Sequence, residues 1–470
     1  MRGIIAYGAY LPYHRLERSA ISAMLGSGGG RGTRAVASYD EDSTSMGVEA
    51  TRALLATAPA DVKPTSLYFA TAEPAYLDKT NASAIHAAAG MDASVFAVDM
   101  MGSVRSGAGA LRAAVDSREP AIAVLSDVRV GLPGSPDESN GGDGAAAFLC
   151  GEGPQVIAEY IGSASVTQEF LDRYRLPGDL ASKVWEERFG EYVYVPLAKQ
   201  ALADAFNKAE VKVEDISHFI VAGMHGRAGR TVAAGSGARP EAVTDDMTAV
   251  MGNCGAAHGG IMLADVLDRA EPNQLISLLL LADGATVMLF RATDALAAYK
   301  AQATVKDLVA SGKPGLSYAS YLTWRNLLNR EPPRRPDPDR PAAPPSFRSD
   351  PWKFGFMASR CDTCGTRALP PQRVCGSCRA VDKTSLERVA DIQATVATFT
   401  IDRLAFSPSP PVVAAVVDFD GGGRFSCEMT DVDPDSVGIG DRVEMTFRRL
   451  YTAEGVHNYF WKARPIRRSS

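Results

Sequence analysis

The sequence predicts an α/β protein with a duplicated N-terminal part, followed by a small metal-binding segment and a small antiparallel β-barrel. Three observations predict this arrangement. Strand and helix patterns alternate over about the first 330 residues, and an Asp-Gly-Ala motif recurs there 140 residues further along. The last 120 residues or so combine two CxxC pairs with alternating β-branched stretches.

Short apolar runs bounded by turn residues indicate buried strands, and runs with a 3.6-residue period indicate the helices that cover them. The strand patterns are Gly3–Ala9, Leu67–Ala72, Ala121–Leu125, Phe219–Gly223 and Leu275–Ala282. The helix patterns are Met46–Ala56, Ser106–Ser117, Pro196–Ala209 and Gly259–Ala270. Because the two kinds alternate along the chain, we expect a layered fold with mainly parallel strands.

A repeated motif indicates that the α/β part is duplicated. Asp143-Gly144-Ala145 and Asp283-Gly284-Ala285 each precede an apolar stretch. Upstream of each lies a long helix pattern, a short lysine-containing loop, a strand, and a glycine-rich segment that opens a helix. Three similarities in the same order favour a true duplication over chance. We expect the halves to cover residues 1–165 and 166–330.

The segment from Glu331 to Ser349 is dense in proline, arginine and aspartate, a composition typical of a stiff linker. A proline-rich binding motif is the alternative. We expect a linker over 331–350, a metal-binding ribbon over 351–382 and a barrel of about five strands over 383–470. The basic run from Arg448 through Lys462 and Arg464 is expected to face a ligand or solvent.

Four cysteines, Cys361, Cys364, Cys375 and Cys378, form two CxxC pairs separated by ten residues. Two such turns place four thiolates around one tetrahedral ion, a set that suits Zn²⁺. With four protein ligands no coordination position stays open, so we expect a structural zinc. A redox pair, an iron–sulfur site and four incidental cysteines are the alternatives.

Charge and hydropathy exclude two classes of function. The chain carries 49 Lys+Arg and 55 Asp+Glu, with no basic footprint that would favour nucleic-acid binding. The longest apolar runs, such as Leu278–Ala282, are strand-length, and a membrane span needs about 20 apolar residues. The N-terminus is typical of a first strand rather than a signal peptide, and the cysteine cluster favours a reducing cytoplasm.

Three local segments place polar side chains directly after predicted strands. Glu73 follows a strand in FATAEPAYLDK, His225 follows one in FIVAGMHGR, and Asn253 lies in the turn MGNCGAAHGG that opens a helix. Each has an ordinary structural reading: Glu73 as a helix cap, His225 as a loop histidine, and Asn253 as a turn residue.

These segments and the duplicated halves resemble the thiolase superfamily, and most closely the hydroxymethylglutaryl-CoA synthases and ketoacyl-ACP synthase III. The cysteine segment and the following barrel resemble a zinc-ribbon/OB-fold domain found beside such enzymes, where it is thought to hold acyl-CoA or bridge partner enzymes. The resemblance implies a five-layer α-β-α-β-α fold, acyl-CoA as substrate, and a homodimer that pairs Ala121–Leu125 with its copy. It also implies catalytic roles for Glu73, His225 and Asn253.

The sequence departs from the family at the nucleophile. The resemblance puts a cysteine five residues after Asp99, and that position holds Val104, preceded by Ser103. Cys254, beside Asn253, belongs to a different loop and is not expected to replace it. Without the cysteine, His225 and Asn253 still suit a thioester oxyanion and Glu73 a proton transfer, which together support aldol, retro-aldol or decarboxylative chemistry.

Substrate contacts are less defined than the catalytic ones. Arg31 and Arg34 are candidates for the CoA phosphates, with solvated loop charges as the alternative, and Val104 and Gly284 are candidates for substrate binding. We expect an acyl-CoA enzyme that forms or cleaves a C–C bond. A catalytically silent acyl-CoA-binding scaffold and a synthase that uses Ser103 as nucleophile are the alternatives.

Overall fold

The computed structural model of the chain describes residues 1–334, 336 and 338–467. Its contacts divide into two units, which we describe separately. The first unit comprises Met1–Ala37, Asp42–Ser83 and Ala93–Tyr318, and the second comprises Ser38–Glu41, Ala84–Asp92 and the described part of Ala319–Ser470.

The first unit alternates strands with helices, as the sequence predicts. Its strands are β1 (Arg2–Tyr10), β2 (His14–Glu17), β3 (Thr33–Val36), β4 (Ser66–Thr71), β5 (Phe96–Met101), β6 (Ala121–Asp127), β7 (Gly144–Glu152), β8 (Ala158–Thr167), β9 (Arg173–Tyr174), β10 (Lys183–Val184), β11 (Ile216–Gly223), β12 (Leu275–Leu281) and β13 (Gly284–Ala292). Its helices are α1 (Arg18–Leu25), α2 (Ser43–Leu55), α4 (Ser106–Asp116), α5 (Pro136–Asn140), α6 (Glu187–Ala209), α7 (Gly226–Gly235), α8 (Thr248–Met251), α9 (His258–Leu267) and α10 (Val305–Ala310). Two further helices, α3 (Ala82–Ala88) and α11 (Tyr318–Trp324), cross the limit between the units.

Strand pairing confirms the duplication. The main sheet has the order β11-β12-β13-β8-β1-β7-β6-β4-β5. In the first repeat β4 runs parallel to β6, and β7 runs antiparallel to both β6 and β1. In the second repeat β11, β12, β13 and β8 pair with the same directions. The two Asp-Gly-Ala motifs open the corresponding strands β7 and β13, each nine residues long.

The expectation of mainly parallel strands is wrong. Among the described strands of the main sheet, three neighbouring pairs are parallel and five are antiparallel. For the pair β12–β13 the reason is the Asp-Gly motif. Only Ala282 and Asp283 separate β12 from β13, and a link that short joins antiparallel neighbours.

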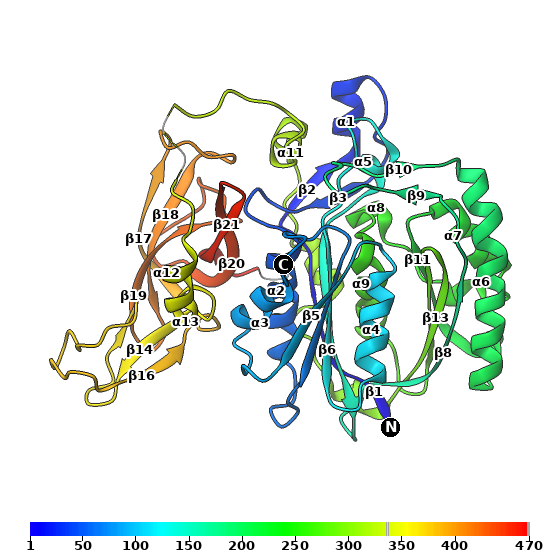
Figure 1. Ribbon diagram of the computed structural model, residues 1–470, viewed down its shortest axis with the longest axis horizontal. Coiled ribbons are helices and arrows are strands. Elements are labelled where there is room, and N and C mark those ends of the chain that lie inside the picture. The colour runs from blue at the N-terminus through cyan, green and yellow to red at the C-terminus, as the bar shows by residue number, and fades with distance from the viewer. Residues whose placement is uncertain (335, 337, 468–470) are drawn as a thin grey trace. The chain divides into compact units, whose positions relative to one another are not determined.

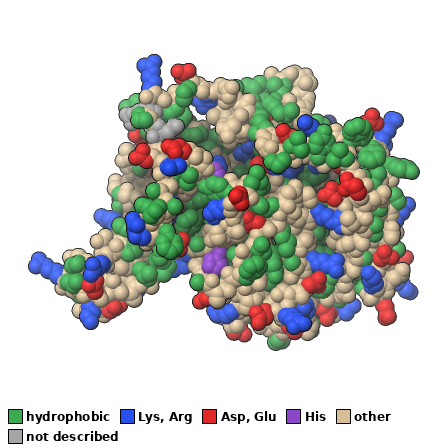
Figure 2. Space-filling view, in the orientation of Figure 1, with side chains coloured by type: hydrophobic (Ala, Val, Ile, Leu, Met, Phe, Trp, Pro, Cys, Tyr) green, Lys and Arg blue, Asp and Glu red, His purple; other side chains and the backbone are tan. Residues whose placement is uncertain are grey.

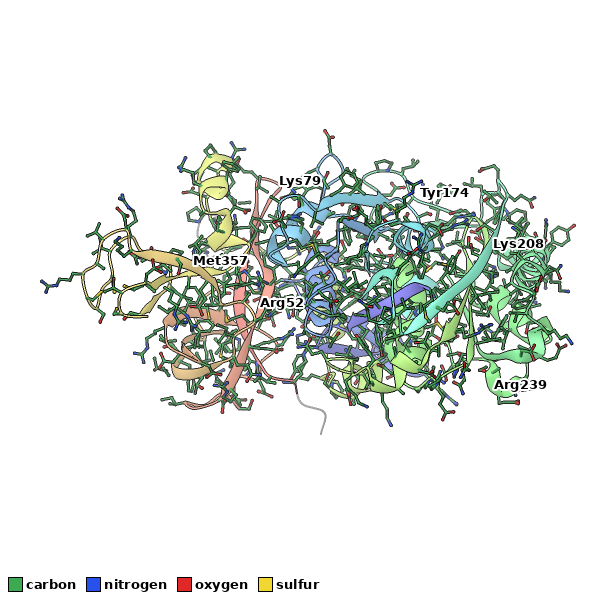
Figure 3. All side chains as sticks on the ribbon, turned by 90° about the horizontal axis from the view of Figure 1, so that it is seen from below. Arg52, Lys79, Tyr174, Lys208, Arg239 and Met357 are labelled. Atoms are coloured by element: carbon green, nitrogen blue, oxygen red, sulfur yellow. The ribbon has the colours of Figure 1, made fainter. Side chains whose placement is uncertain are left out.

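The two repeats form the five layers that the resemblance implies. Helix α2 covers one outer face, α4 and α9 lie in the middle, and α6 and α7 cover the other outer face (Figure 1). Figure 3 shows the same layers from below, with Arg52 on α2 and Lys208 on α6 marking the opposite outer layers. Leu111 of α4 and Ile261 of α9 are buried in the core between the two halves. Helix α6 begins earlier than expected, so Pro196 lies inside it rather than in its first turn.

The expectation that Ala121–Leu125 pairs with its copy in a dimer is also wrong. Strand β6, which contains Ala121–Leu125, lies between β4 and β7 and is fully buried. Its backbone groups are therefore already paired on both sides. The edge of the first repeat is β5, which pairs only with β4 among the described strands and begins with the exposed Phe96.

The second unit contains a three-stranded ribbon and a closed five-stranded barrel. The ribbon consists of β14 (Met357–Cys361), β15 (Arg367–Ala368) and β16 (Thr384–Arg388). The barrel consists of β17 (Ala394–Asp402), β18 (Val412–Phe419), β19 (Arg424–Met429), β20 (Arg442–Ala453) and β21 (Val456–Pro465), in the order β17-β18-β19-β21-β20. Within the proline-rich segment, α12 (Ala343–Arg348) is helical where the composition predicts extended chain, and α13 (Asp350–Lys353) follows.

The basic residues near the C-terminus are not directed at ligand or solvent. Arg448 is completely buried and pairs with Asp431 at 2.6 Å and with Glu41 at 2.8 Å. Lys462 is 1% exposed and pairs with Asp40 at 3.1 Å. Such charges have to be paired, because an isolated buried charge costs several kcal/mol. The short segment Ser38–Glu41 thus joins the second unit through its carboxylates.

On the face drawn in Figure 2, acidic and basic side chains are interspersed rather than gathered by sign. Among the described residues, no helix is both long and apolar enough to cross a membrane.

Candidate functional site

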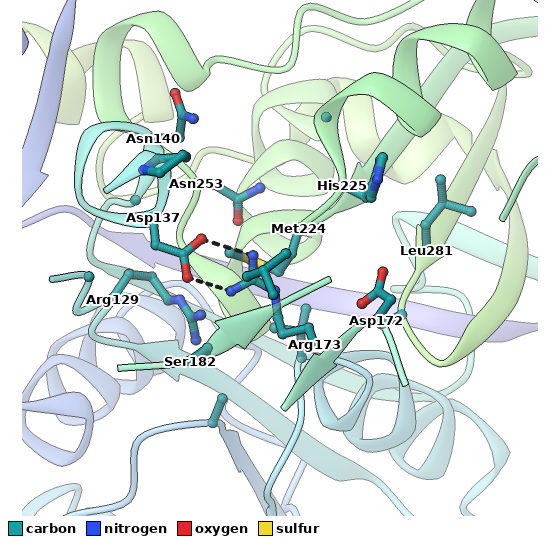
Figure 4. A pocket seen from close by; sticks show the side chains of 18 of the residues that line it. Arg129, Asp137, Asn140, Asp172, Arg173, Ser182, Met224, His225, Asn253 and Leu281 are labelled. Carbon is teal, nitrogen blue, oxygen red and sulfur yellow. Dashed lines mark hydrogen bonds and ion pairs between the residues drawn. The ribbon is translucent and has the colours of Figure 1, made fainter. Parts of the chain in front are cut away.

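A cavity of about 600 Å³ opens in the first unit at the ends of β4, β6 and β11. It brings together four of the residues singled out from the sequence: Ser103, Val104, His225 and Asn253. Figure 4 shows His225 and Asn253 on adjacent segments of its wall. Side chains from the hairpin β9–β10 and from the loop before α5 complete the lining.

Ser103 and Val104 lie between β5 and the N-terminus of α4. Gly102 turns the chain there with a φ of 108°, a conformation that favours glycine. The Ser103 hydroxyl oxygen accepts the Arg105 N–H at 3.2 Å, and Val104 is 7% exposed. The position that the resemblance assigns to the nucleophile therefore lines the cavity, and it carries an isopropyl group.

His225 is the N-cap of α7, where its Nδ1 accepts the Ala228 N–H at 3.0 Å. A neutral imidazole that accepts at Nδ1 carries its proton on Nε2. The ring packs so closely against Gly190 of α6 that a Cβ at position 190 would lie 2.5 Å from His225 Nε2. Nearby are the Tyr194 ring, at 5.9 Å between centroids, and the carboxylate of Asp172.

Asn253 is held in place by backbone contacts on both sides. Its amide Nδ2 donates to the Gly223 carbonyl at 2.7 Å, and its Oδ1 accepts the Gly255 N–H at 3.0 Å. Gly252 lets the loop of Asn253 approach the loop that contains Gly141, because a Cβ at position 252 would lie 2.2 Å from the Gly141 oxygen. Since an amide nitrogen has two N–H groups, one remains to serve a ligand in the cavity.

Glu73 does not line the cavity in this structure, although Ala72 does. Its carboxylate pairs with Arg175 from the β9–β10 hairpin, whose guanidinium also donates to the Ala72 carbonyl at 2.6 Å. Burial raises the pKa of the Glu73 carboxyl above its usual value, and the Arg175 charge opposes that rise. The neighbouring Asp127 adds to the rise, and Arg129 lowers the pKa. Glu73 thus lies at the edge of the site, where its ion pair with Arg175 holds the carboxylate and opposes the rise of its pKa.

Replacing Arg175 by glutamine should raise the pKa of Glu73 further, because the substitution removes the nearest positive charge. The limb of the pH–rate profile governed by Glu73 should then move to higher pH. Arg112→Gln is the matched control, since it removes an exposed arginine paired with Asp116 on α4. An unchanged limb in Arg175→Gln would mean that the ion pair does not set the protonation of Glu73.

Sequence reasoning missed the polar residues of the β9–β10 hairpin and of the loops around the cavity. Asp172, Arg173, Arg175 and Arg129 line it, and Arg173 forms a two-bond ion pair with Asp137 at 2.6 and 2.8 Å (Figure 4). The only sequence signal was the density of charge in the stretch DRYR. That stretch has no strand or helix period that would place it near His225.

Three other sequence candidates lie outside the cavity lining. Arg31 is exposed on the loop before β3. Arg34 is completely buried and pairs with Asp143, also completely buried, at 3.5 Å, so the expectation that it meets CoA phosphates is wrong. Gly284 begins β13 with a φ of 125°, and a Cβ there would lie 2.2 Å from the Val166 oxygen, which gives it a packing role. Cys254 is buried outside the cavity lining, and burial raises the pKa of its thiol.

The four cysteines of the second unit meet at one point. Their sulfur atoms all lie within 4.8 Å of one another, with Cys361–Cys378 at 3.6 Å and Cys364–Cys375 at 3.5 Å. Tetrahedral Zn–S bonds of about 2.3 Å require sulfur–sulfur distances of about 3.8 Å. Both turns close in the same way, because Gly365 N–H donates to the Cys361 carbonyl at 2.8 Å and Arg379 N–H to the Cys375 carbonyl at 3.0 Å. The arrangement fits a four-thiolate metal site.

Comparisons with known proteins show which proteins the chain is similar to. Hydroxymethylglutaryl-CoA synthase of Methanopyrus kandleri is 26% identical over 344 residues, which cover 69% of this chain and 97% of that protein. A solved structure titled HMG_CoA synthase complexed with CoA covers 68% of this chain and 89% of its own, with a TM-score of 0.57 and 16% identity. The chain is a thiolase-like relative of the hydroxymethylglutaryl-CoA synthases. The fold expected from the resemblance is therefore confirmed.

Two further matches are to other proteins. The family described as "ChsH2, C-terminal OB-fold domain" matches residues 387–448, which include most of the barrel. A DUF35 domain-containing scaffold protein of Methanothermobacter thermautotrophicus is 29% identical over 125 residues, which cover 26% of this chain and 93% of that protein. This synthase relative thus carries an OB-fold domain in the same chain as its thiolase-like part.

Proposed function

We propose that the first unit forms or cleaves a C–C bond next to an acyl-CoA thioester without a covalent acyl-enzyme. One observation carries the proposal. Val104 occupies the position that the resemblance gives to the nucleophile, and it lies in the same cavity as His225 and Asn253. A valine side chain cannot form a thioester, whereas the two polar groups beside it suit a reaction that needs only an activated carbonyl.

In the proposed reaction, His225 and Asn253 hold the thioester oxygen. The Nε2–H of His225 and the second N–H of Asn253 donate to that oxygen as negative charge develops on it, and the N-terminus of α4 adds a favourable dipole. A polarised thioester more readily loses a proton from its α-carbon, CO2 from a carboxylate on that carbon, or an aldehyde by cleavage of the bond to the β-carbon, because the electron pair left behind forms the enolate. The reaction class thus covers aldol addition, retro-aldol cleavage and decarboxylation, whether it runs in the transferase or the lyase direction.

Glu73 moves the proton in this scheme. Its raised pKa brings a carboxyl closer to the pH at which it can exchange a proton with substrate. Arg175 holds the carboxylate at the edge of the cavity, so a substrate that engages Arg175 frees Glu73 to turn inward. Ser103, whose hydroxyl already accepts a backbone N–H, has no role as nucleophile in this scheme.

Coenzyme A is the proposed carrier of the acyl group. Arg227 and Arg230 of α7 line the cavity and offer positive charge for phosphates, with Arg31 as a more distant candidate. The second unit is proposed to hold one structural Zn²⁺ through its four cysteines. We further propose a cytoplasmic protein that acts on small-molecule thioesters and not on nucleic acid.

The proposal is tested by incubating the protein with a panel of acyl-CoAs and following the CoA products by mass spectrometry. New or shortened acyl-CoAs support C–C bond chemistry. A catalytically silent scaffold is the second candidate, favoured by the similarity to a DUF35 domain-containing scaffold protein. Binding of acyl-CoA without any change of product would support the scaffold instead.

We expect a homodimer in which β5 pairs with its copy across a two-fold axis. Strand β5 is an edge strand, and an unpaired edge of this kind invites pairing with another chain. Light scattering at micromolar concentration should give twice the chain mass of 49.8 kDa. A monomer under these conditions would exclude the dimer.

A further inference from the structure

The geometry points to Asp127 as a positioning residue that holds the two loops carrying Glu73 and Asn253 in their working places. Asp127 is the last residue of β6 and is completely buried behind the cavity. It does not line the cavity, so it acts through other residues. The inference rests on the proposed function, since it concerns the groups assigned to that reaction.

Each carboxylate oxygen of Asp127 serves one loop. Oδ1 accepts the Ala72 N–H at 3.0 Å and the Thr71 hydroxyl at 3.2 Å, directly before Glu73. Oδ2 accepts the Ala256 N–H at 2.9 Å, three residues after Asn253. These loops come from opposite repeats of the first unit. One buried side chain thus fixes the distance between the proposed proton carrier and the proposed oxyanion group.

The same carboxylate steadies a positive charge of the cavity wall. Arg129 Nη1 lies 3.6 Å from Asp127 Oδ2, and the Arg129 side chain lines the cavity. Gly255 makes this arrangement possible, because a Cβ there would lie 2.1 Å from Asp127 Oδ2. Glycine also suits the φ of 54° at that position. The site is therefore built around two oxygens that both accept hydrogen bonds.

An asparagine cannot reproduce these contacts. Its amide offers one acceptor oxygen, and its NH₂ group would face either the Ala72 N–H or the Ala256 N–H, a donor against a donor. One loop would lose its partner, and the buried N–H would be left unsatisfied. Asparagine nevertheless keeps the size and shape of aspartate, so the substitution tests charge and hydrogen bonding rather than volume.

Asp127 also acts on Glu73 through its charge. The groups that face Glu73 are Arg175 from the β9–β10 hairpin, Arg129 from the loop after β6, and Asp127. The Asp127 charge raises the pKa of Glu73, while both arginines lower it. Removing the Asp127 charge should therefore lower the pKa of Glu73. A residue that only stabilised the fold would leave that pKa unchanged.

The test compares three variants of the full chain: Asp127→Asn, Gly255→Ala and Ser126→Ala. Asp127→Asn should lower kcat by on the order of 10²-fold with little change in KM, because the reacting groups are misplaced rather than removed. Gly255→Ala displaces the carboxylate but keeps its charge, so kcat should fall as well. Ser126→Ala is the matched control, since Ser126 is the buried neighbour on β6 whose hydroxyl has no hydrogen-bond partner among the described residues.

A second readout needs no turnover. A water-soluble carbodiimide labels protonated carboxyls, and peptide mass spectrometry gives the pH midpoint of labelling at Glu73. Asp127→Asn should move this midpoint to lower pH, whereas Gly255→Ala and Ser126→Ala should leave it in place. If the wild type makes no CoA product but the midpoint still moves, the proposed function fails while the placement of Asp127 beside Glu73 stands.

Two results would overturn the inference. The first is wild-type kcat together with an unmoved midpoint in Asp127→Asn. The second is a loss of kcat in Asp127→Asn with the midpoint unmoved, which would reduce Asp127 to a residue of the fold. If Asp127→Asn does not fold, as judged by circular dichroism, Gly255→Ala decides, and wild-type kcat in that variant rejects the inference.

Discussion

Replacing His225 by alanine should lower kcat/KM for the acyl-CoA reaction by on the order of 10²-fold or more, the usual effect of removing one oxyanion donor. The backbone N–H of Ala228 fixes the ring through Nδ1, so Nε2 carries the proton that the thioester oxygen needs. Alanine removes that proton donor together with the hydrogen bond that caps α7. Steady-state kinetics with the best acyl-CoA of the panel measures the effect.

His218→Ala is the matched control for this prediction. His218 lies in β11 of the same unit, bonds to Gln274 at 2.8 Å and does not line the cavity. Its loss should leave kcat/KM close to the wild-type value. Glu73→Gln, which keeps the shape of the side chain and removes its basicity, should lose activity on the same scale as His225→Ala. Unchanged product formation in both catalytic variants would favour the silent scaffold.

Replacing Cys361 by serine should abolish zinc binding and unfold the ribbon. Metal binding to a four-thiolate site is coupled to folding and contributes about 10–16 kcal/mol in small zinc domains. Elemental analysis should find about one zinc per chain in the wild type and none in the variant. Limited proteolysis should then cut the ribbon first, while the α/β part stays resistant.

Cys427→Ser is the control for the zinc experiment. Cys427 lies in β19 of the barrel, partly exposed and outside the cysteine cluster. This variant should keep its zinc and its protease resistance. Freshly purified wild-type protein without zinc would contradict the assignment of the four cysteines to a structural metal.

Local patterns predicted the elements well, because each pattern reflects a local cause. The apolar runs that became β1, β4, β11 and β12 are bounded by turn residues, and the repeated Asp-Gly motif opens equivalent strands. The two CxxC pairs converge because each turn is fixed by its own backbone hydrogen bond. Strand directions within the sheet depend instead on the chain's path between strands, and there the prediction of mainly parallel pairing was wrong.

The candidate site could be predicted only where a motif marks the residue. Four marked residues follow strands or open helices, and they meet in one cavity: Ser103, Val104, His225 and Asn253. Arg34, Arg448 and Lys462 look like surface cations in sequence. Their burial depends on the carboxylates Asp143, Glu41 and Asp40, which lie far away along the chain. Arg175 and Asp127 were missed for the same reason, since their partners come from other segments.

The central claim, acyl-CoA chemistry without an acyl-enzyme, is tested most directly by the intact mass of the protein after incubation with acetyl-CoA. The wild type and Ser103→Ala should convert the best acyl-CoA of the panel at similar rates, and neither should gain an acetyl group from acetyl-CoA. Val104→Cys places a thiol at the position of the family's nucleophile and should gain one acetyl group on that residue. An acetyl group on Ser103 of the wild type, with activity lost in Ser103→Ala, would contradict the account.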